Sequence, residues 1–229
     1  MLFSELHPDS IDYPFDLSNH IVRLEEIREF ESFPFLTPES IQILHQIINS
    51  HSDKIQSNDR ISFYLRGLGY HSSFLRDLCY SPPILQYLRH ITGIELIPHY
   101  LFSNVGHVNI GLPNQKDVDH WHYDSVPYVL ILLVTDPMTF EGGILEYEKE
   151  SRVFQVRFPH AGYAFFMKGS EIRHHVTTLH SGRRWTLINS YMDKKETRDT
   201  TNLKTFEKDP AFQKEMQHKP IFYQKIDSL

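Results

Sequence analysis

The amino-acid sequence predicts a mainly β protein with a helical N-terminal part. In residues 1–93 apolar side chains recur at the three- and four-residue spacing of amphipathic helices. From residue 94 to 193 the chain instead divides into about eight short runs rich in β-branched and aromatic residues, which is typical of an all-β sandwich or barrel. Residues 194–229 form a charged C-terminal extension. A chain of 229 residues fits a single domain of this composition, and we expect one.

The helices are indicated by their start and stop signals. Thr37 and Pro38 are a typical N-cap and first-turn pair, and apolar residues follow them at helical spacing. A second helix is expected over residues 74–80. A third begins near Pro82 and ends at Gly93, a residue type that commonly terminates helices.

The strands follow from alternation and from turn residues. We expect them at residues 95–102, 107–111, 128–134, 144–147, 153–157, 163–167, 174–179 and 185–191. The apolar run at residues 126–134 has about half the ~20 residues that cross a bilayer, so it predicts a buried strand. A weak helical pattern returns at Asp209–Gln217.

Composition disfavours several classes of function. The formal charge is -6, from 23 basic and 29 acidic residues, and no dense basic run is present, which disfavours nucleic acid and anionic membranes as partners. The one cysteine, Cys79, has no intramolecular disulfide partner, and the N-terminal residues lack a secretory pattern, so we expect a cytoplasmic protein. The sequence does not indicate an oligomeric state. The 15 histidines invite a search for a metal site.

A His-x-Asp pair on a strand directs two metal-ligating side chains to one face. Three such pairs occur: His7/Asp9, His51/Asp53 and His122/Asp124. The first lies in an irregular stretch, and the second lies just past a helix end, where Ser and Asp are common turn residues, so we expect neither to bind metal. His122 and Asp124 precede the most hydrophobic run, and we expect both at the front of that strand, held rigidly.

A third ligand is offered by His174 or His175, at the start of a later strand. Two histidines and one carboxylate on one face of an ion are typical of non-haem Fe(II) oxygenases, although the same set also suits a hydrolytic Zn²⁺ site. Arg184 and Thr186 share one face of the last long strand. A guanidinium binds a carboxylate through two hydrogen bonds, and a nearby hydroxyl adds another, so this pair fits the far carboxylate of a dicarboxylic keto acid.

Several short motifs follow one another in a fixed order between residues 118 and 191. They are His122-x-Asp124, Phe140-Glu141-Gly142-Gly143-Ile144-Leu145, Pro159-x-x-Gly162 and His174-His175-Val176, leading to Ser181-Gly182-Arg183-Arg184-Trp185-Thr186. Together they resemble the Fe(II)/2-oxoglutarate-dependent dioxygenases over about a third of the chain. The resemblance implies a double-stranded β-helix (jelly-roll) core with flanking helices.

The resemblance also implies roles for individual residues. His122, Asp124 and His174 would bind Fe(II), and Arg184 with Thr186 would bind 2-oxoglutarate. His174 is preferred to His175 because the family's distal histidine often stands in a His-x-Val context, ten residues before the arginine. By the same comparison His175 and His180 would lie around the site or at the surface. Arg183 competes with Arg184, but it faces away from Thr186 on a strand.

The activity implied is hydroxylation of an unactivated C–H bond with O2, releasing succinate and CO2. The substrate would be a small molecule, such as a free amino acid or derivative, as in the stand-alone enzymes related to the amino-acid radical halogenases. Those halogenases lack the carboxylate ligand that Asp124 supplies here, which favours hydroxylation. The alternatives are a peptidyl hydroxylase resembling prolyl hydroxylases, a non-enzymatic metal-binding protein of the cupin type, and a Zn-dependent hydrolase.

Overall fold

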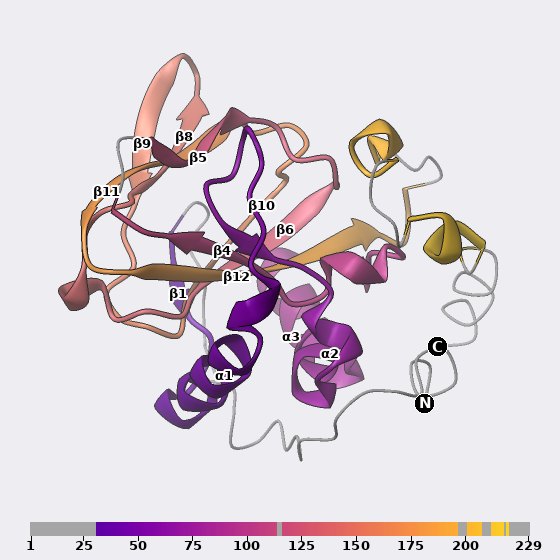
Figure 1. The fold of residues 1–229 in the computed structure, drawn as a ribbon. Coiled ribbons are helices and arrows are strands. Elements are labelled where there is room, and N and C mark those ends of the chain that lie inside the picture. The colour runs from indigo at the N-terminus through magenta and orange to yellow at the C-terminus, as the bar shows by residue number, and fades with distance from the viewer. Residues whose placement is uncertain (1–30, 114–115, 197–200, 208–211, 218, 220–229) are drawn as a thin grey trace.

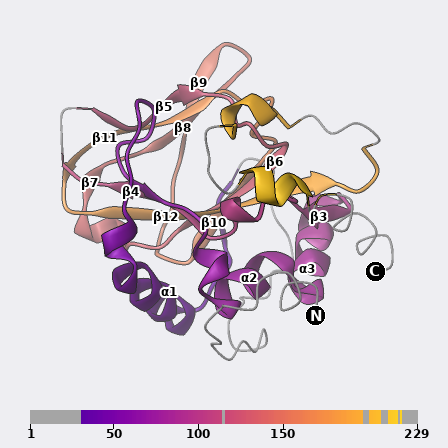
Figure 2. The same ribbon diagram turned by 45° about the vertical axis from the view of Figure 1, so that its right-hand side comes forward.

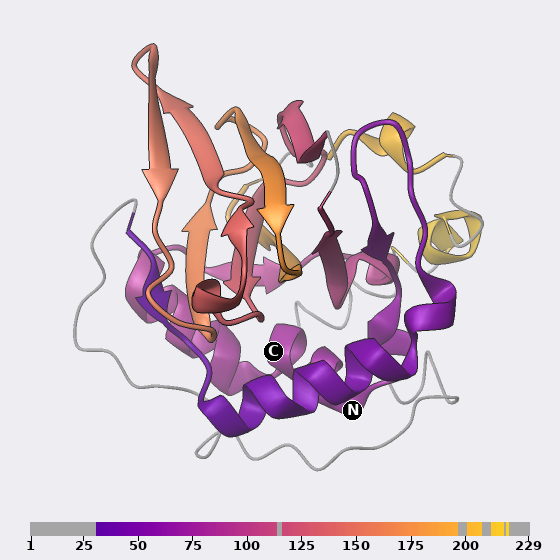
Figure 3. The same cartoon turned by 60° about the vertical axis from the view of Figure 1, so that its left-hand side comes forward.

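The computed structural model of the protein describes residues 31–113, 116–196, 201–207, 212–217 and 219, and it is built in three layers (Figure 1). Helices cover one face of a seven-stranded sheet, and a five-stranded sheet covers the other. The views in Figures 2 and 3 keep this order of layers, with the helices on the same side throughout. This arrangement confirms the prediction of a mainly β fold with helices that flank it.

The helices begin and end where the local signals predict. They are α1 (Pro38–Ser50), α2 (Ser73–Tyr80) and α3 (Pro82–Thr92). The Thr37 side chain accepts a hydrogen bond from the backbone N–H of Ser40, and Gly93 ends α3 with a φ of 69°, in the left-handed region that glycine tolerates. Nowhere in the described part of the chain is a helix both long enough and apolar enough to cross a membrane.

Both sheets are antiparallel. The seven-stranded sheet has the order β1 (Phe33–Pro34), β10 (Tyr163–Met167), β6 (Tyr128–Leu133), β12 (Arg184–Asp193), β4 (His107–Gly111) and β2 (Tyr64–Leu65), and β3 (Leu96–Pro98) also pairs with β12. The five-stranded sheet has the order β5 (Asp117–His122), β11 (His174–Ser181), β8 (Leu145–Lys149) and β9 (Arg152–Val156), with β7 (Glu141–Gly142) paired with β11.

Strand β6 explains the longest apolar run in the sequence. Leu130 and Leu132 belong to the core that the large sheet forms with the helices. Val129 and Ile131, which point the other way, belong to the core between the two sheets. Because both faces of β6 are buried, every position of this strand is apolar or aromatic.

The structure differs from the sequence predictions in three places. Residues 95–102 contain only the short strand β3, followed by a 3-10 turn at Phe102–Asn104. Strand β5 was not predicted, because its sequence, DVDHWH, is mostly polar. The helical N-terminal part also contributes β1 and β2 to the large sheet. Within the predicted C-terminal helix, residues 212–217 are helical and residues 209–211 lie outside the described residues.

Candidate metal centre and keto-acid site

Two histidines from neighbouring strands form the base of the site. His122 is the last residue of β5, His174 is the first residue of β11, and the two are paired directly in the antiparallel register. Direct cross-strand partners have adjacent side chains. Their imidazole centroids are accordingly 4.2 Å apart.

Asp124 completes the group from a loop, and this corrects one prediction. The expectation that His122 and Asp124 share the front of the hydrophobic strand is wrong: His122 ends β5, Asp124 lies in the connection to β6, and β6 begins only at Tyr128. The backbone N–H of Asp124 donates to the carbonyl oxygen of Gly169 at 2.8 Å, which fixes the loop against the segment that leads into β11.

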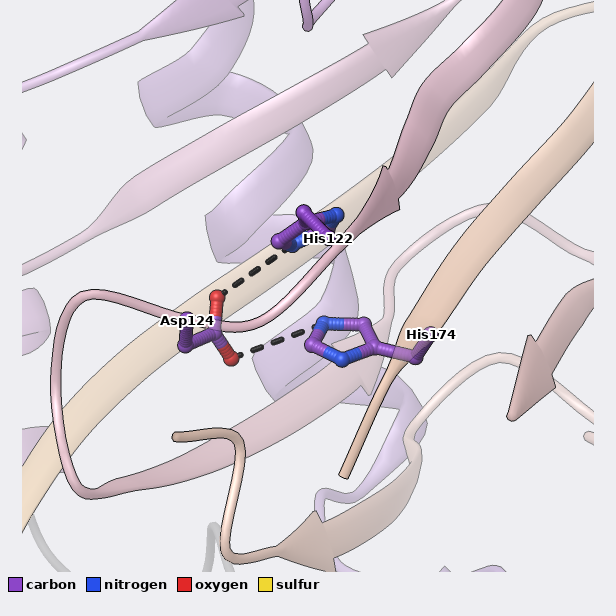
Figure 4. A group of neighbouring side chains, drawn as sticks. All are labelled: His122, Asp124 and His174. Atoms are coloured by element: carbon purple, nitrogen blue, oxygen red, sulfur yellow. Dashed lines mark ion pairs between the residues drawn. The ribbon is translucent and has the colours of Figure 1, made fainter. Parts of the chain in front are cut away.

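The carboxylate of Asp124 bridges the two rings, as Figure 4 shows. Its Oδ1 lies 3.4 Å from Nε2 of His122, and its Oδ2 lies 3.5 Å from Nε2 of His174. The three potential ligand atoms all lie within 4.8 Å of one another. No other cluster of three or more such side chains is found in the part of the chain that the structure describes.

Backbone carbonyl groups set the orientation of both imidazoles. Nδ1 of His122 lies 2.6 Å from the carbonyl oxygen of His120, and Nδ1 of His174 lies 2.8 Å from that of Ile172. A carbonyl oxygen only accepts, so each Nδ1–H donates, and in the neutral ring Nε2 keeps its lone pair. Both lone pairs therefore face the Asp124 carboxylate, which is the tautomer that a metal ion requires.

The electrostatics of the group favour an ionised carboxylate. Burial raises the pKa of Asp124, but the nearby His174 and His122 outweigh burial and lower this pKa to about 2. Burial lowers the pKa of His174. It also acts to lower the pKa of His122, but Asp124 and Asp119 overcome this effect and raise it. Two imidazole nitrogens and one carboxylate match the donor set that binds Fe(II) with open positions, and also Zn²⁺.

Arg184 and Thr186 lie side by side at the start of β12. The Arg184 side chain is fully buried, and its Nη1 donates to Oγ1 of Thr186. Burial lowers the pKa of Arg184 to about 10, so the guanidinium stays charged at neutral pH. Among the described residues no carboxylate forms an ion pair with it. The charge of Asp119 acts on Arg184 without forming an ion pair, so an anion bound in contact with the guanidinium would offset the cost of burying it.

A single cavity joins the histidines and Asp124 to this arginine. It lies between the two sheets. Its polar lining comprises Arg60, Asn109, Asp119, His122, Asp124, His174, Arg184 and Thr186. Its apolar lining comprises Val129, Ile131, Leu145, Val176 and Ile188. The five residues singled out in the sequence therefore line one space.

The competing residues point elsewhere. His175 is buried and stacks on Trp121, with the two ring centroids 3.8 Å apart. Its Nδ1 lies 3.3 Å from Oδ2 of Asp117, and its Nε2 lies 2.9 Å from Oε2 of Glu146. The guanidinium of Arg183 lies over the ring of Trp185, outside this cavity.

The other histidine candidates also lie apart from this group. His180 is exposed. His51 is the C-cap residue that follows α1, and its Nδ1 lies 2.8 Å from the carbonyl oxygen of Ile47, so the His51/Asp53 pair lies at a helix terminus. The His7/Asp9 pair lies outside the described residues.

Sequence reasoning missed three residues that support the site. Asp119 is buried, with its Oδ1 3.5 Å from Nδ1 of His122 and 3.2 Å from Nε of Arg60, and its Oδ2 accepts from Asn109 at 3.2 Å. Burial raises the pKa of Asp119. Gly169 has so little space around it that a Cβ would lie 2.1 Å from Oδ2 of Asp124. No local pattern marks Asp119, Arg60 or Gly169, because each acquires its role from contacts across the fold.

Comparisons with known proteins agree with the fold. No protein-family model and no curated protein sequence matches the chain. Solved structures do match it. A prolyl 4-hydroxylase from Pseudomonas putida is 13% identical, with a TM-score of 0.52 over 85% of this chain and 100% of that one.

Two further structures are similar. The α-ketoglutarate-dependent carbocyclase SnoK of nogalamycin biosynthesis is 14% identical, with a TM-score of 0.54 over 71% of this chain and 78% of that one. HygX from Streptomyces hygroscopicus, determined with nickel and 2-oxoglutarate bound, is 12% identical, with a TM-score of 0.52 over 69% of this chain and 80% of that one. At these identities the likeness concerns the fold: the chain has the jelly-roll fold of the 2-oxoglutarate-dependent oxygenases, as its motifs predict.

Proposed function

We propose that this protein is an Fe(II)- and 2-oxoglutarate-dependent dioxygenase that hydroxylates an unactivated C–H bond of a small molecule and releases succinate and CO2. One observation carries the proposal: a single cavity joins the donor set of His122, Asp124 and His174 to the buried guanidinium of Arg184. A chelating centre at one end and a cation at the other are the two features that a dicarboxylic keto acid requires.

In this proposal His122, Asp124 and His174 hold Fe(II), while Arg184 and Thr186 hold the far carboxylate of 2-oxoglutarate. The bound iron, keto acid and O2 supply the oxidising chemistry. The chain supplies position: the carbonyl groups of residues 120 and 172 fix the two imidazoles, and the apolar residues of the cavity exclude water.

The retained carboxylate of Asp124 supports hydroxylation over halogenation, since related halogenases lack that ligand. For the substrate we propose a free amino acid or a derivative. The second candidate is a peptidyl hydroxylase, which is favoured by the match to the whole length of the Pseudomonas putida prolyl 4-hydroxylase. The cytoplasmic location expected from composition stays a prediction.

Neighbouring residues in the chain provide matched control variants. We would load the protein with Ni(II), titrate 2-oxoglutarate by calorimetry, and separately measure succinate formation with Fe(II) and O2. His174→Gln should abolish metal binding and turnover, whereas His175→Gln should retain both. Arg184→Gln should weaken 2-oxoglutarate binding by about 10- to 100-fold with metal binding retained, whereas Arg183→Gln should bind normally.

Other results would contradict the proposal. If the metal binds but 2-oxoglutarate does not, a cupin-like metal protein or a Zn-dependent hydrolase explains the site better. If His175→Gln abolishes metal binding and His174→Gln does not, the ligand set is wrong.

A further inference from the structure

Strand β5 contains a bulge that turns Asp119 toward the metal centre. His122 pairs with His174 and Asp119 pairs with Val176, so three steps along β5 lie opposite two steps along β11. On a regular strand, side chains three residues apart face opposite sides, and the extra residue of a bulge returns them to the same side. Asp119 and His122 accordingly line the same cavity as His174 and Val176. The bulge therefore brings a carboxylate next to a proposed metal ligand.

The Asp119 carboxylate is buried, and one of its oxygens receives no hydrogen bond. Its Oδ1 lies 3.5 Å from Nδ1 of His122 and 3.2 Å from Nε of Arg60. Neither nitrogen is aligned to donate to it, and no other described residue does so. Arg60 offsets part of the charge, but the Arg60 side chain is 35% exposed. Burying such an oxygen is costly, so a further positive charge nearby would stabilise it.

Hydrogen bonds from strand β4 hold the other oxygen of Asp119 in place. Nδ2 of Asn109 donates to Oδ2 of Asp119 at 3.2 Å, and Oδ1 of Asn109 accepts from Nε2 of His107 at 2.6 Å. Burial lowers the pKa of His107 to about 3, so its imidazole is neutral and carries a single N–H. The His107 ring also stacks on Tyr64, with the two centroids 5.8 Å apart. Because all of these side chains are buried, Asp119 is held beside His122.

Asp119 lies near the nitrogen of His122 that does not face Asp124. Nε2 of His122 faces Asp124, whereas Nδ1 faces the carbonyl oxygen of His120 and Oδ1 of Asp119. An acceptor at the distal N–H of a metal-bound imidazole makes the ring a stronger donor, and the charge of a carboxylate increases this effect. Nδ1 of His174 instead has the carbonyl oxygen of Ile172 as its neighbour. The two histidines therefore differ in the charge next to Nδ1.

We propose that Asp119 is a positioning residue of the metal centre, which acts through His122. Its charge strengthens the bond between Nε2 of His122 and the metal, and the bound metal in turn supplies the positive charge that stabilises Oδ1 of Asp119. The inference rests on the proposed function, since it requires His122 to be a ligand. It adds to the three ligands a group that acts through one of them.

Two aspartates on one strand provide the test and its control. Asp119→Asn removes the charge and keeps the shape of the side chain. Asp117→Asn removes the same charge two residues away, where the carboxylate contacts Thr178 and His175 outside the cavity. On each full-length protein we would measure the Ni(II) affinity by calorimetry and the unfolding temperature without metal. We would also record, under anaerobic conditions, the visible charge-transfer band of the complex with Fe(II) and 2-oxoglutarate.

We expect Asp119→Asn to raise the Kd for Ni(II) by about 10- to 100-fold, the usual effect of changing a group that supports a metal ligand. Its unfolding temperature without metal should not fall, because the substitution removes a buried charge whose Oδ1 has no hydrogen bond. The band should move to shorter wavelength, because the transferred electron leaves an iron with a weaker donor set less readily. Asp117→Asn should bind Ni(II) as tightly as the native protein and leave the band in place.

The outcomes separate this inference from the proposed function. If the native protein does not bind Ni(II), the proposed function fails, and this inference fails with it. If the native protein binds Ni(II) but Asp119→Asn matches Asp117→Asn in affinity and band position, the inference is wrong and the proposed function stands.

A purely structural role for Asp119 would also overturn the inference. It would appear as a lower unfolding temperature without metal and a band that does not move in Asp119→Asn. Should this variant not fold, Asp119→Ser removes the same charge with a smaller side chain. Failure of both variants to fold would show that the fold itself requires Asp119, contrary to the inference.

Discussion

Substitution of Gly169 tests the metal centre without altering a proposed ligand. In Gly169→Ala the new Cβ would lie 2.1 Å from Oδ2 of Asp124 and 2.9 Å from both Cβ and Cγ of that residue. Ordinary contact begins near 3.4 Å, so the carboxylate oxygen must move by the difference between 3.4 and 2.1 Å, about 1.3 Å. Gly169 does not have a positive φ, so alanine adds steric conflict without backbone strain.

Metal sites tolerate ligand displacements of only about 0.2 Å, so a movement of this size should disrupt the site. We expect the Kd for Ni(II) to rise by about 10- to 100-fold, which corresponds to about 1.4–2.8 kcal/mol. The assay is calorimetric titration of Ni(II), with thermal unfolding measured on the same sample. Ser170→Ala is the control, because it adds no atoms next to Asp124.

The reasoning is refuted if Gly169→Ala folds and binds Ni(II) as tightly as Ser170→Ala. Asp124 would then either not be a ligand or be free to move away without loss. A variant that fails to fold shows only the steric conflict. In that case Asp124→Asn provides the direct comparison of metal affinity.

Two further predictions concern buried titratable groups. The pKa of His107 is lowered to about 3 in the folded chain against about 6.5 in the unfolded chain, so the unfolded state binds the extra proton and stability falls as the pH drops below 6.5. Between pH 7 and pH 5 this histidine should lower the free energy of unfolding by about 2 kcal/mol. Urea unfolding of His107→Asn should therefore show a loss of stability over this pH range that is smaller by that amount. Equal losses in the two proteins would contradict the assignment. Burial raises the pKa of the Cys79 thiol to about 12, so a thiol reagent at pH 8 should label it only after unfolding, and rapid labelling of the native protein would contradict its burial.

Local signals were sufficient to predict the helices and most strands. Thr37, Pro38 and Gly93 act through hydrogen bonds and backbone preferences that depend only on nearby residues. The run that forms β6 is apolar throughout because both of its faces are buried, a condition that the sequence displays directly.

The sequence predicted which residues form the metal centre, but not which structural elements bring them together. The sequence singled out His122, Asp124 and His174, and the structure brings them together, but through a cross-strand pair and a loop. Strand β5 has no apolar alternation, because its sequence is largely polar and its inward-facing side chains include members of the site. Its pairing with β11 is a long-range contact that a local pattern does not encode.

A second group of residues around Asp124, which lines a neighbouring pocket, could not be predicted from the sequence for the same reason. Arg60 and Arg66 come from the N-terminal part, His107 from β4, and Phe206 from the C-terminal segment. These residues lie far apart along the chain, and ordinary surface arginines have the same local appearance. Only the packing of the three layers brings them to one side of Asp124.

The most direct test of the account is an anaerobic titration of the protein with Fe(II) and then with 2-oxoglutarate, followed by visible absorption. A keto acid that chelates Fe(II) through two oxygens produces a weak charge-transfer band. The account predicts that this band appears in the native protein and that, at the same 2-oxoglutarate concentration, it is lost in Arg184→Gln while Fe(II) still binds. Fe(II) binding with no band at saturating 2-oxoglutarate would contradict the account.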